Sequence, residues 1–472
     1  MFARIPYLPD FATLSHNMRV KLLVALVVTA TCASAAPDIL FLISDDLGWM
    51  DVGYRGSEIR TPNIDRLAAQ GARLDRYYAF PLCSPTRAAV LTGKSSLTLG
   101  VEGPMHAEKG MPLDVLTLPE ILGKAGYQTY MTGKWHLGQY NVKYWPQARG
   151  FDHFYGHAGG VLDFFTHNFL GRLDWQRNGS SVREEGYSTH LIADEAVGLL
   201  NKRDKSKPAF LYVAFNAPHT PLQAPEGAID KYANIEDQKR RIFAAMVDEM
   251  DAAIGRVLEA APKDALVVWV SDNGGNLSAG ANNGKLRGTK GQVFEGGVRV
   301  PGAVYWPGHV EGGRTVSQRV SAHDWLPTLA AATGFDAPSD LYGQNMWPAI
   351  AEGKKVARKP FVLGAHGAYA IYDGEWKLAQ DVSHDRKQTV TEHLFRINHD
   401  PYEKNDLAAA HPDKVKELAA QIAALPKGES LASPPPWMRS APPGGAPPRR
   451  RGPMVGWPKE TGPPIAESAA RD

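Results

Sequence analysis

Four short apolar segments recur along the first 270 residues, and each leads directly into polar residues. They cover residues 38–44, 126–131, 210–215 and 265–270. Segments of this length, with little alternation of apolar and polar positions, are typical of strands buried on both faces of a sheet. The pattern predicts a large, mostly parallel sheet between layers of helices in this part of the chain.

The spacing of apolar residues between and after these strands predicts helices and a second structural region. Helices are expected over residues 63–71 and 117–125, and a long amphipathic helix over residues 240–261. The pattern changes after residue 328, where short strands of an antiparallel sheet precede one more helix. These later elements are expected at residues 368–379, 393–395 and 414–425. They indicate a smaller C-terminal α+β subdomain.

The first 35 residues have the composition of an export signal. A basic region at 18–21 precedes an apolar region at 22–30, and Ala33-Ser34-Ala35 fits a cleavage site. The apolar region is too short to span a bilayer. We therefore expect an exported protein, periplasmic or secreted, without a membrane-spanning segment in its mature part.

The chain of 472 residues is too long for one small core, and its composition divides it into four parts. An N-terminal extension and signal peptide are followed by the main domain, the smaller subdomain and a tail rich in proline, glycine and arginine. Their expected bounds are residues 1–35, 36–335, 336–430 and 431–472. The net charge of +2 gives no field strong enough to argue for nucleic acid binding.

Polar residues follow all four buried strands, at the ends where parallel sheets bind ligands. Polar residues after a single strand usually belong to a solvated turn. Polar residues after all four strands indicate a single site along one edge of the sheet. In chain order these residues are Asp45 and Asp46, Lys134 and His136, His219, and Asp272 and Asn273. Lys134 and His136 have alternating spacing, which predicts that they share a face of an extended strand.

The acidic members of this set indicate a metal ion. Two like charges about 4 Å apart cost about 4 kcal/mol at an effective dielectric of about 20, so grouping Asp45, Asp46 and Asp272 requires a cation. Together with the Asn273 amide they form an all-oxygen set, which suits Ca²⁺ or Mg²⁺ better than zinc or copper. One divalent ion is therefore expected.

Cys83 stands in the segment Leu82-Cys83-Ser84-Pro85-Thr86-Arg87, which predicts the start of a helix capped by Ser84. The only other cysteine, Cys32, lies in the predicted signal peptide, where a lipid anchor is the weaker alternative because residues 29–31 fit such a site poorly. A lone exported thiol is either an inert buried cysteine or a reactive group at a helix start. Arg87 adds a fixed positive charge one turn away.

Cationic side chains are expected around Cys83. Arg87, Lys134, His136, His219 and Lys290 form a pocket that selects a compact anionic group and stabilises charge on its oxygens. His219 or Lys290 is a candidate general acid for a leaving group.

The segment Cys83-Ser84-Pro85-Thr86-Arg87, followed by Leu91-Thr92-Gly93-Lys94, resembles the sulfatase motif. Further blocks resemble the same family in the same order, and the closest ones point to its N-acetylgalactosamine 4-sulfatase (arylsulfatase B) branch. These blocks are Asp45-Asp46 and residues 133–138, 216–221, 271–275 and 286–291. The resemblance implies an alkaline-phosphatase-like fold, a sulfated saccharide or aryl sulfate as substrate, and a formylglycine-generating enzyme as a partner during maturation.

The resemblance also implies a role for each residue. Asp45, Asp46, Asp272, Asn273 and the modified Cys83 would hold one Ca²⁺ or Mg²⁺ ion. The hydrated aldehyde made from Cys83 would attack sulfur, and His219 and Lys290 would assist the leaving alcohol. His136 would help to expel sulfate, while Arg87 and Lys134 would hold the nucleophile and the sulfate group.

Two other functions fit the same residues. A phosphate or phosphonate ester hydrolase of the same superfamily keeps the metal site and changes the substrate. A non-catalytic protein that binds sulfated glycans would leave Cys83 as a thiol. The sugar-binding residues are open, and residues 163–167 and Trp306 are candidates for them or for core packing.

Overall fold

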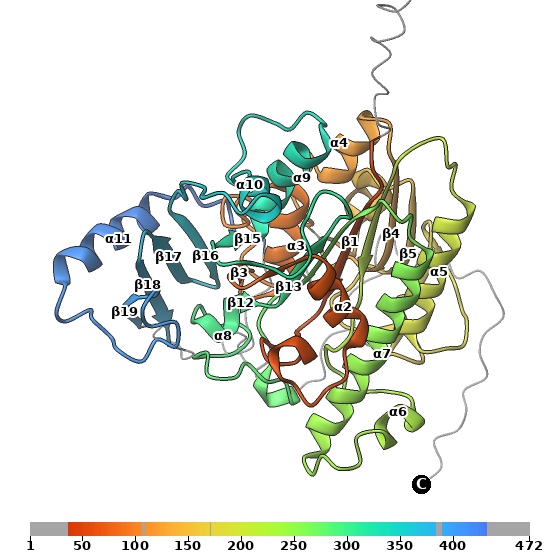
Figure 1. Cartoon of the computed structure of the whole chain (residues 1–472), viewed down its shortest axis with the longest axis horizontal. Helices are drawn as coiled ribbons and strands as arrows, with labels where there is room; N and C mark the ends of the chain where they lie inside the picture. The colour runs from red at the N-terminus through yellow and green to blue at the C-terminus, as the bar shows by residue number, and fades with distance from the viewer. Residues whose placement is uncertain (1–35, 106–108, 170, 384–388, 432–472) are drawn as a thin grey trace, which may run out of the picture. The chain divides into compact units, whose positions relative to one another are not determined.

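The computed structural model describes residues 36–105, 109–169, 171–383 and 389–431 (Figure 1). The predicted signal peptide and nearly all of the predicted tail lie outside these residues. Within the described part of the chain, no helix is both long and apolar enough to cross a membrane.

A ten-stranded sheet forms the centre of the main domain, in the order β14-β2-β13-β11-β1-β10-β4-β5-β8-β9. The four strands predicted from the apolar segments are adjacent and parallel: β11 (Leu266–Ser271), β1 (Ile39–Ser44), β10 (Ala209–Ala214) and β4 (Gln128–Lys134). β5 (His153–His157) extends the parallel part. The strands toward the edges are β13 (Gly302–Tyr305), β2 (Ala72–Leu74), β14 (Arg314–Val316), β8 (Gln176–Arg177) and β9 (Ser180–Ser181), and most of their pairings are antiparallel.

Helices cover both faces of this sheet (Figure 1). Ile39, Phe41 and Ile43 of β1 belong to one apolar core, whereas Leu40 and Leu42 belong to the other, as the period of two along a strand requires. The first core includes residues of α3 (Cys83–Thr92), α4 (Leu118–Lys124) and α9 (Trp325–Thr333), and the second includes residues of α2 (Pro62–Gln70), α5 (Ser188–Lys202) and α7 (Gln238–Ala260). The predicted fold class is confirmed.

Shorter elements complete the main domain. In the described part of the chain, the remaining α-helices before the C-terminal sheet are α6 (Glu226–Asp230), α8 (Glu295–Val298) and α10 (Trp347–Ala351). A three-stranded sheet joins β3 (Tyr77–Tyr78), β12 (Arg299–Val300) and β15 (Val320–Ser321), and a hairpin joins β6 (Asn168–Phe169) to β7 (Arg172–Leu173).

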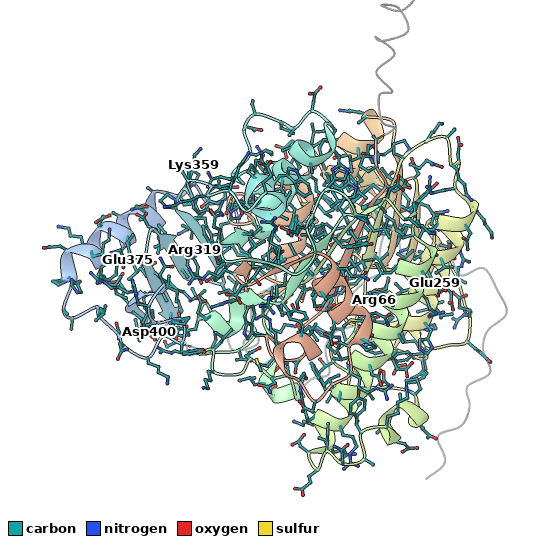
Figure 2. The ribbon with its side chains drawn as sticks, in the orientation of Figure 1. Arg66, Glu259, Arg319, Lys359, Glu375 and Asp400 are labelled. Atoms are coloured by element: carbon teal, nitrogen blue, oxygen red, sulfur yellow. The ribbon has the colours of Figure 1, made fainter. Side chains whose placement is uncertain are left out.

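The C-terminal region is an antiparallel four-stranded sheet with one helix. Its strands are β16 (Phe361–Ala365), β17 (Ala368–Asp373), β18 (Trp376–Val382) and β19 (Val390–Arg396), followed by α11 (Pro412–Ala424). The antiparallel strands expected at residues 368–379 form a hairpin, in which the chain reverses at Gly374, where φ is 55°. Charged side chains such as Lys359, Glu375 and Asp400 surround this region (Figure 2).

A buried ionic cluster joins this sheet to the main domain. Lys377 of β18 lies 3.1 Å from Glu295 and 2.7 Å from Glu403, and all three side chains are almost completely buried. Tyr78 and Tyr372 donate further hydrogen bonds to Glu295. Two buried carboxylates therefore share the Lys377 ammonium group, and Arg299 adds a longer contact to Glu295 at 3.8 Å.

We expect Lys377→Met to lower the free energy of unfolding by roughly 3–5 kcal/mol, because removing one partner leaves buried charges uncompensated. Denaturant titration measures this change. The control is Lys414→Met, which breaks a solvent-exposed pair with Glu417 at 2.8 Å and should cost less than about 1 kcal/mol. Equal losses for both variants would contradict the account.

Candidate active site

The ends of β11, β1, β10 and β4 lie side by side, since these strands are neighbours and parallel. Each end delivers the polar residues that the sequence singled out. Asp45 and Asp46 follow β1, Lys134 ends β4 with His136 two residues on, His219 follows β10, and Asp272 and Asn273 follow β11. Cys83 and Arg87 come from the first turns of α3, and Lys290 from the loop before α8.

The acidic residues are in mutual contact. Asp272 accepts a hydrogen bond from the Asp46 backbone at 3.2 Å, and the Asn273 amide donates to the Asp46 carboxylate at 2.8 Å. One ligand atom from each of Asp45, Asp46, Cys83 and His219 lies within 4.8 Å of the others. Asp46 has φ of 68°, so β1 turns sharply at its end and both carboxylates point into the same site.

The hydrogen-bonding state of two oxygens in this group shows whether a cation fits among these residues. Asp45 Oδ1 and Asn273 Oδ1 are buried and accept no hydrogen bond. A buried polar atom without a partner is costly, and a hard cation is a partner that carboxylate and amide oxygens suit. Lys290 already contacts Asp46 at 2.7 Å and neutralises part of the negative charge. The residues present therefore fit one Ca²⁺ or Mg²⁺ ion.

Buried lysine and arginine side chains form ion pairs with the carboxylates. Lys134 Nζ bonds to Asp45, and Arg87 binds Asp272 through Nε at 3.1 Å and through Nη2 at 2.9 Å. Burial opposes ionisation of Asp45, but Lys134, His219 and Arg87 outweigh it and hold its pKa below the usual range. Burial and the neighbouring charge of Asp45 raise the pKa of Asp272 to about 7.

Cys83 is the first residue of α3, which makes Leu82 the N-cap. The prediction that Ser84 caps the helix is wrong, because its hydroxyl donates to the His136 carbonyl at 2.8 Å and accepts from the Met105 backbone at 3.2 Å. Cys83 is only 2% exposed, and burial raises the pKa of its thiol to about 12. The thiolate is therefore disfavoured near neutral pH, which argues against an unmodified reactive cysteine.

His136 and Lys134 do not share a face of a strand as predicted. β4 ends at Lys134, and His136 has φ of 59°, so the chain turns between the two residues. The backbone of Gly160 packs against the His136 ring, where a Cβ atom would lie 2.3 Å from Nε2. Glycine at this position lets the following loop approach the site closely.

His219 presents one ring nitrogen to the acidic cluster. Its Nδ1 lies 2.6 Å from the Thr220 carbonyl and donates to it, which leaves Nε2 facing Asp46 at 3.7 Å. Burial, followed by the charge of Lys290, lowers the pKa of His219. Lys290 is partly buried, yet Asp46 outweighs the cost of desolvation and raises the pKa of Lys290. Lys290 is therefore the protonated member of this pair near neutral pH.

His157 is a residue of the site that the sequence analysis missed. It ends β5 directly opposite Lys134 in the strand register, and it is completely buried. Burial, followed by the charge of Lys134, holds its pKa well below the ordinary value. The sequence feature that could have identified His157 is the end of a fifth parallel strand. The segment of that strand was too short and too polar to be recognised.

Trp306 is outside the site. Its ring nitrogen donates to the carbonyl of Asp264, which precedes β11, so it lies at the end of the strand opposite Asp272. His167 is also a packing residue, since it is buried and stacks on Trp175 at 4.6 Å. Of the two interpretations left open for Trp306, sugar binding or core packing, the structure supports core packing.

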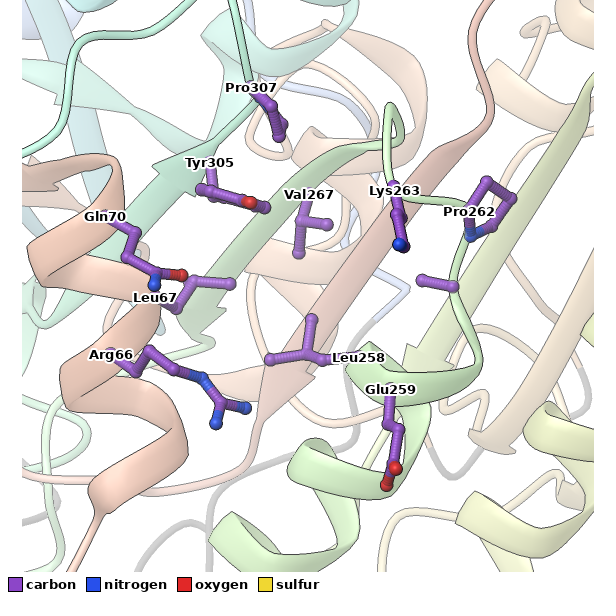
Figure 3. A pocket seen from close by; sticks show the side chains of 11 residues that line it. Arg66, Leu67, Gln70, Leu258, Glu259, Pro262, Lys263, Val267, Tyr305 and Pro307 are labelled. Atoms are coloured by element: carbon purple, nitrogen blue, oxygen red, sulfur yellow. The ribbon is translucent and has the colours of Figure 1, made fainter.

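A separate cavity of about 350 Å³ lies between α2, α7 and β13 (Figure 3). Leu258, Val267 and Tyr305 form its apolar lining, and Arg66 and Glu259 stand near its edge. Val267 is the second residue of β11, whereas the catalytic candidates follow the last residue of that strand. This cavity is therefore distinct from the acidic site.

Comparison with known proteins gives the family. The sequence profile of the sulfatase family matches residues 37–335. Arylsulfatase J of Mus musculus is 33% identical over 459 residues, covering 84% of this chain and 77% of the mouse protein. N-acetylgalactosamine-6-sulfatase of Homo sapiens is 31% identical over 450 residues, covering 83% of this chain and 85% of the human protein.

Solved structures agree. Ps i-CgsB in complex with k-i-k-neocarrahexaose has a TM-score of 0.78 at 33% identity, covering 84% of this chain and 94% of that one. A phosphonate monoester hydrolase of Agrobacterium radiobacter shares the fold alone, with a TM-score of 0.61 at 19% identity, covering 82% of this chain and 95% of that one.

The chain belongs to the sulfatase family and is a sulfuric ester hydrolase. The predicted family and enzyme class are confirmed. The roles of the individual site residues and the 4-sulfatase branch remain predictions.

Proposed function

We propose that this protein hydrolyses sulfate esters of saccharides, with residue 83 as the nucleophile after a formylglycine-generating enzyme has oxidised it. One observation carries the proposal. Cys83 lies among Asp45, Asp46 and His219 at the start of a helix, fully buried and with its thiol pKa raised. A thiol in this setting is a poor nucleophile, whereas an aldehyde hydrate would supply an oxygen nucleophile at the same position.

The metal ligands are assigned to Asp45, Asp46, Asp272 and Asn273, with the modified residue 83. A bound Ca²⁺ or Mg²⁺ ion would polarise a sulfuryl oxygen and favour the ionised hydroxyl beside it. The buried oxygens of Asp45 and Asn273 without hydrogen bonds support this assignment.

The cationic residues bind the sulfate group and move protons. Arg87 and Lys134 are fully buried and fixed by Asp272 and Asp45, so they are positioned before a substrate arrives. Lys290 keeps its proton and suits a developing negative charge on the leaving oxygen. His219, with Nε2 toward the site, and His136 are the candidates for proton transfer.

Saccharides are the preferred substrate class. The human relative is named for N-acetylgalactosamine 6-sulfate, and Ps i-CgsB was solved with k-i-k-neocarrahexaose. The sequence resemblance instead favours a 4-sulfate of N-acetylgalactosamine. Export to the periplasm or beyond, proposed from residues 18–35, is consistent with a polymeric substrate outside the cell.

Phosphate or phosphonate ester hydrolysis is the second candidate, because the fold is shared with a phosphonate monoester hydrolase. The family assignment disfavours it. A protein that only binds sulfated glycans requires that residue 83 stay a thiol.

Sulfate release from a substrate panel tests the proposal. The panel contains 4-sulfated and 6-sulfated N-acetylgalactosamine disaccharides, k-i-k-neocarrahexaose, 4-nitrophenyl sulfate and 4-nitrophenyl phosphate. We expect kcat/KM for the aryl sulfate to exceed that for the phosphate by at least about 100-fold, a difference of about 2.7 kcal/mol in transition-state binding. We also expect at least one saccharide to be desulfated. Dominant phosphatase activity would reject the proposal.

A further inference from the structure

An exposed aromatic side chain stands on the loop that follows β5 and borders the site. This loop begins against His136, where Gly160 packs on the imidazole ring. Five residues further along, Phe165 is 42% exposed, unlike the buried Phe164 beside it. Phe165 therefore belongs to a loop that contacts the site at Gly160, and the proposed chemistry does not use it.

Hydrogen bonds fix the backbone around Phe165. The Asp163 carboxylate accepts from the backbone of Phe165 at 3.1 Å and of Thr166 at 2.8 Å. Its other oxygen accepts from the side-chain amide nitrogen of Gln223 at 2.8 Å, and the side-chain oxygen Oε1 of Gln223 accepts from the Phe164 backbone at 2.9 Å. Because Gln223 lies four residues after His219, the aromatic loop is bound directly to the loop that carries the proposed proton donor.

The Phe165 ring packs against a second aromatic side chain. It packs on Tyr187 with the ring centres 5.2 Å apart, and Phe164 stacks on the same tyrosine at 5.4 Å. The Tyr187 hydroxyl donates to the Gln223 carbonyl at 2.9 Å. An aromatic ring held in this way offers apolar area at little cost in side-chain entropy.

We propose that Phe165 stacks on the apolar face of a pyranose ring of the sulfated saccharide and so forms a sugar subsite beside the sulfate pocket. This inference rests on the proposed function, since it assigns the part of the substrate that carries the sulfate. The cationic pocket holds the sulfate, and the carrier sugar leaves it past the loops of Gly160 and Gln223. A pyranose presents C–H groups on one face and hydroxyls at its rim, which matches an exposed ring among polar groups.

The contact is made equally in the ground state and the transition state, so it affects binding and leaves the chemical step unchanged. For Phe165→Ala we expect KM for the best saccharide of the panel to rise by roughly ten-fold, with kcat unchanged. The inhibition constant of inorganic sulfate should stay the same, since sulfate occupies only the cationic pocket. Phe165→Tyr should retain the wild-type KM.

Tyr402→Ala is the matched control, because Tyr402 is a similarly exposed aromatic (39%) in the C-terminal region. It should leave every constant unchanged. Phe165→Leu keeps an apolar side chain but removes the aromatic ring, and it replaces the alanine variant in this test if that variant unfolds. It should also raise KM for the saccharide.

The two proposals fail differently. If wild-type protein releases no sulfate from any panel compound, the proposed function is rejected and the subsite with it. If wild-type protein desulfates a saccharide but the alanine and leucine variants keep its KM, the subsite alone is overturned. A lower kcat at unchanged KM would also overturn it, since that result places Phe165 in support of the chemical groups.

Discussion

Cys83→Ala is expected to reduce sulfate-ester turnover by at least about a thousand-fold, the scale on which enzymes lose activity without their nucleophile. The physical reason is that residue 83 supplies the proposed nucleophile beside Asp45, Asp46 and His219. Release of 4-nitrophenol from the aryl sulfate measures the loss. The proposed metal ligands that follow β1 and β11 stay in place, so binding of inorganic sulfate should persist.

A matched control separates chemistry from packing at this helix. Val90 belongs to α3 and is fully buried, but its side chain lies in the apolar core. Val90→Ala should cost roughly 1–3 kcal/mol of stability and leave turnover per folded molecule near that of the wild type. Substantial turnover by Cys83→Ala would remove residue 83 from the mechanism.

Asp45→Asn is expected to lower both activity and stability. Asp45 faces the proposed ion with a free oxygen and holds the fully buried Lys134 with the other. Loss of one acidic ligand and of the charge that positions Lys134 should reduce kcat/KM by at least about 100-fold. Leaving Lys134 buried without its partner should cost roughly 3–5 kcal/mol. Kinetics with added Ca²⁺ or Mg²⁺ and denaturant titration measure the two effects.

Asp38→Asn is the control for the stability term. Asp38 immediately precedes the same strand at its opposite end, is also buried, and pairs with Arg203 at 2.5 Å. It should destabilise the protein by a comparable amount without changing kcat/KM of the folded fraction. If the two variants lost the same activity per folded molecule, Asp45 would be a structural residue only.

Much of the fold follows from local pattern. The four apolar segments predicted adjacent strands because a parallel sheet buried on both faces leaves no polar positions along them. Helix bounds such as Pro62–Gln70 and Gln238–Ala260 differ from the expected ones by one or two residues, since helix ends depend on capping contacts. The edge strands are only two to four residues long and were not recognised.

The site could be predicted from the sequence because its residues follow the ends of parallel strands, and the topology of the sheet brings these ends together. What the sequence could not give depends on tertiary contacts. His136 turns away from the strand because its backbone adopts positive φ, and Ser84 bonds to a carbonyl 52 residues away instead of capping its helix. The sequence left two interpretations of Trp306 open because nothing local shows that the preceding strand runs antiparallel to its neighbours and so ends away from the site.

The central claim is that residue 83 carries an aldehyde in the active protein. Mass spectrometry of the tryptic peptide of residues 77–87, from a preparation that hydrolyses 4-nitrophenyl sulfate, tests it most directly. We expect a peptide in which the –CH₂SH group of residue 83 is replaced by –CHO; this aldehyde reacts with a hydrazine reagent and is absent from Cys83→Ala. An active preparation whose peptide contains only the intact thiol would contradict the account.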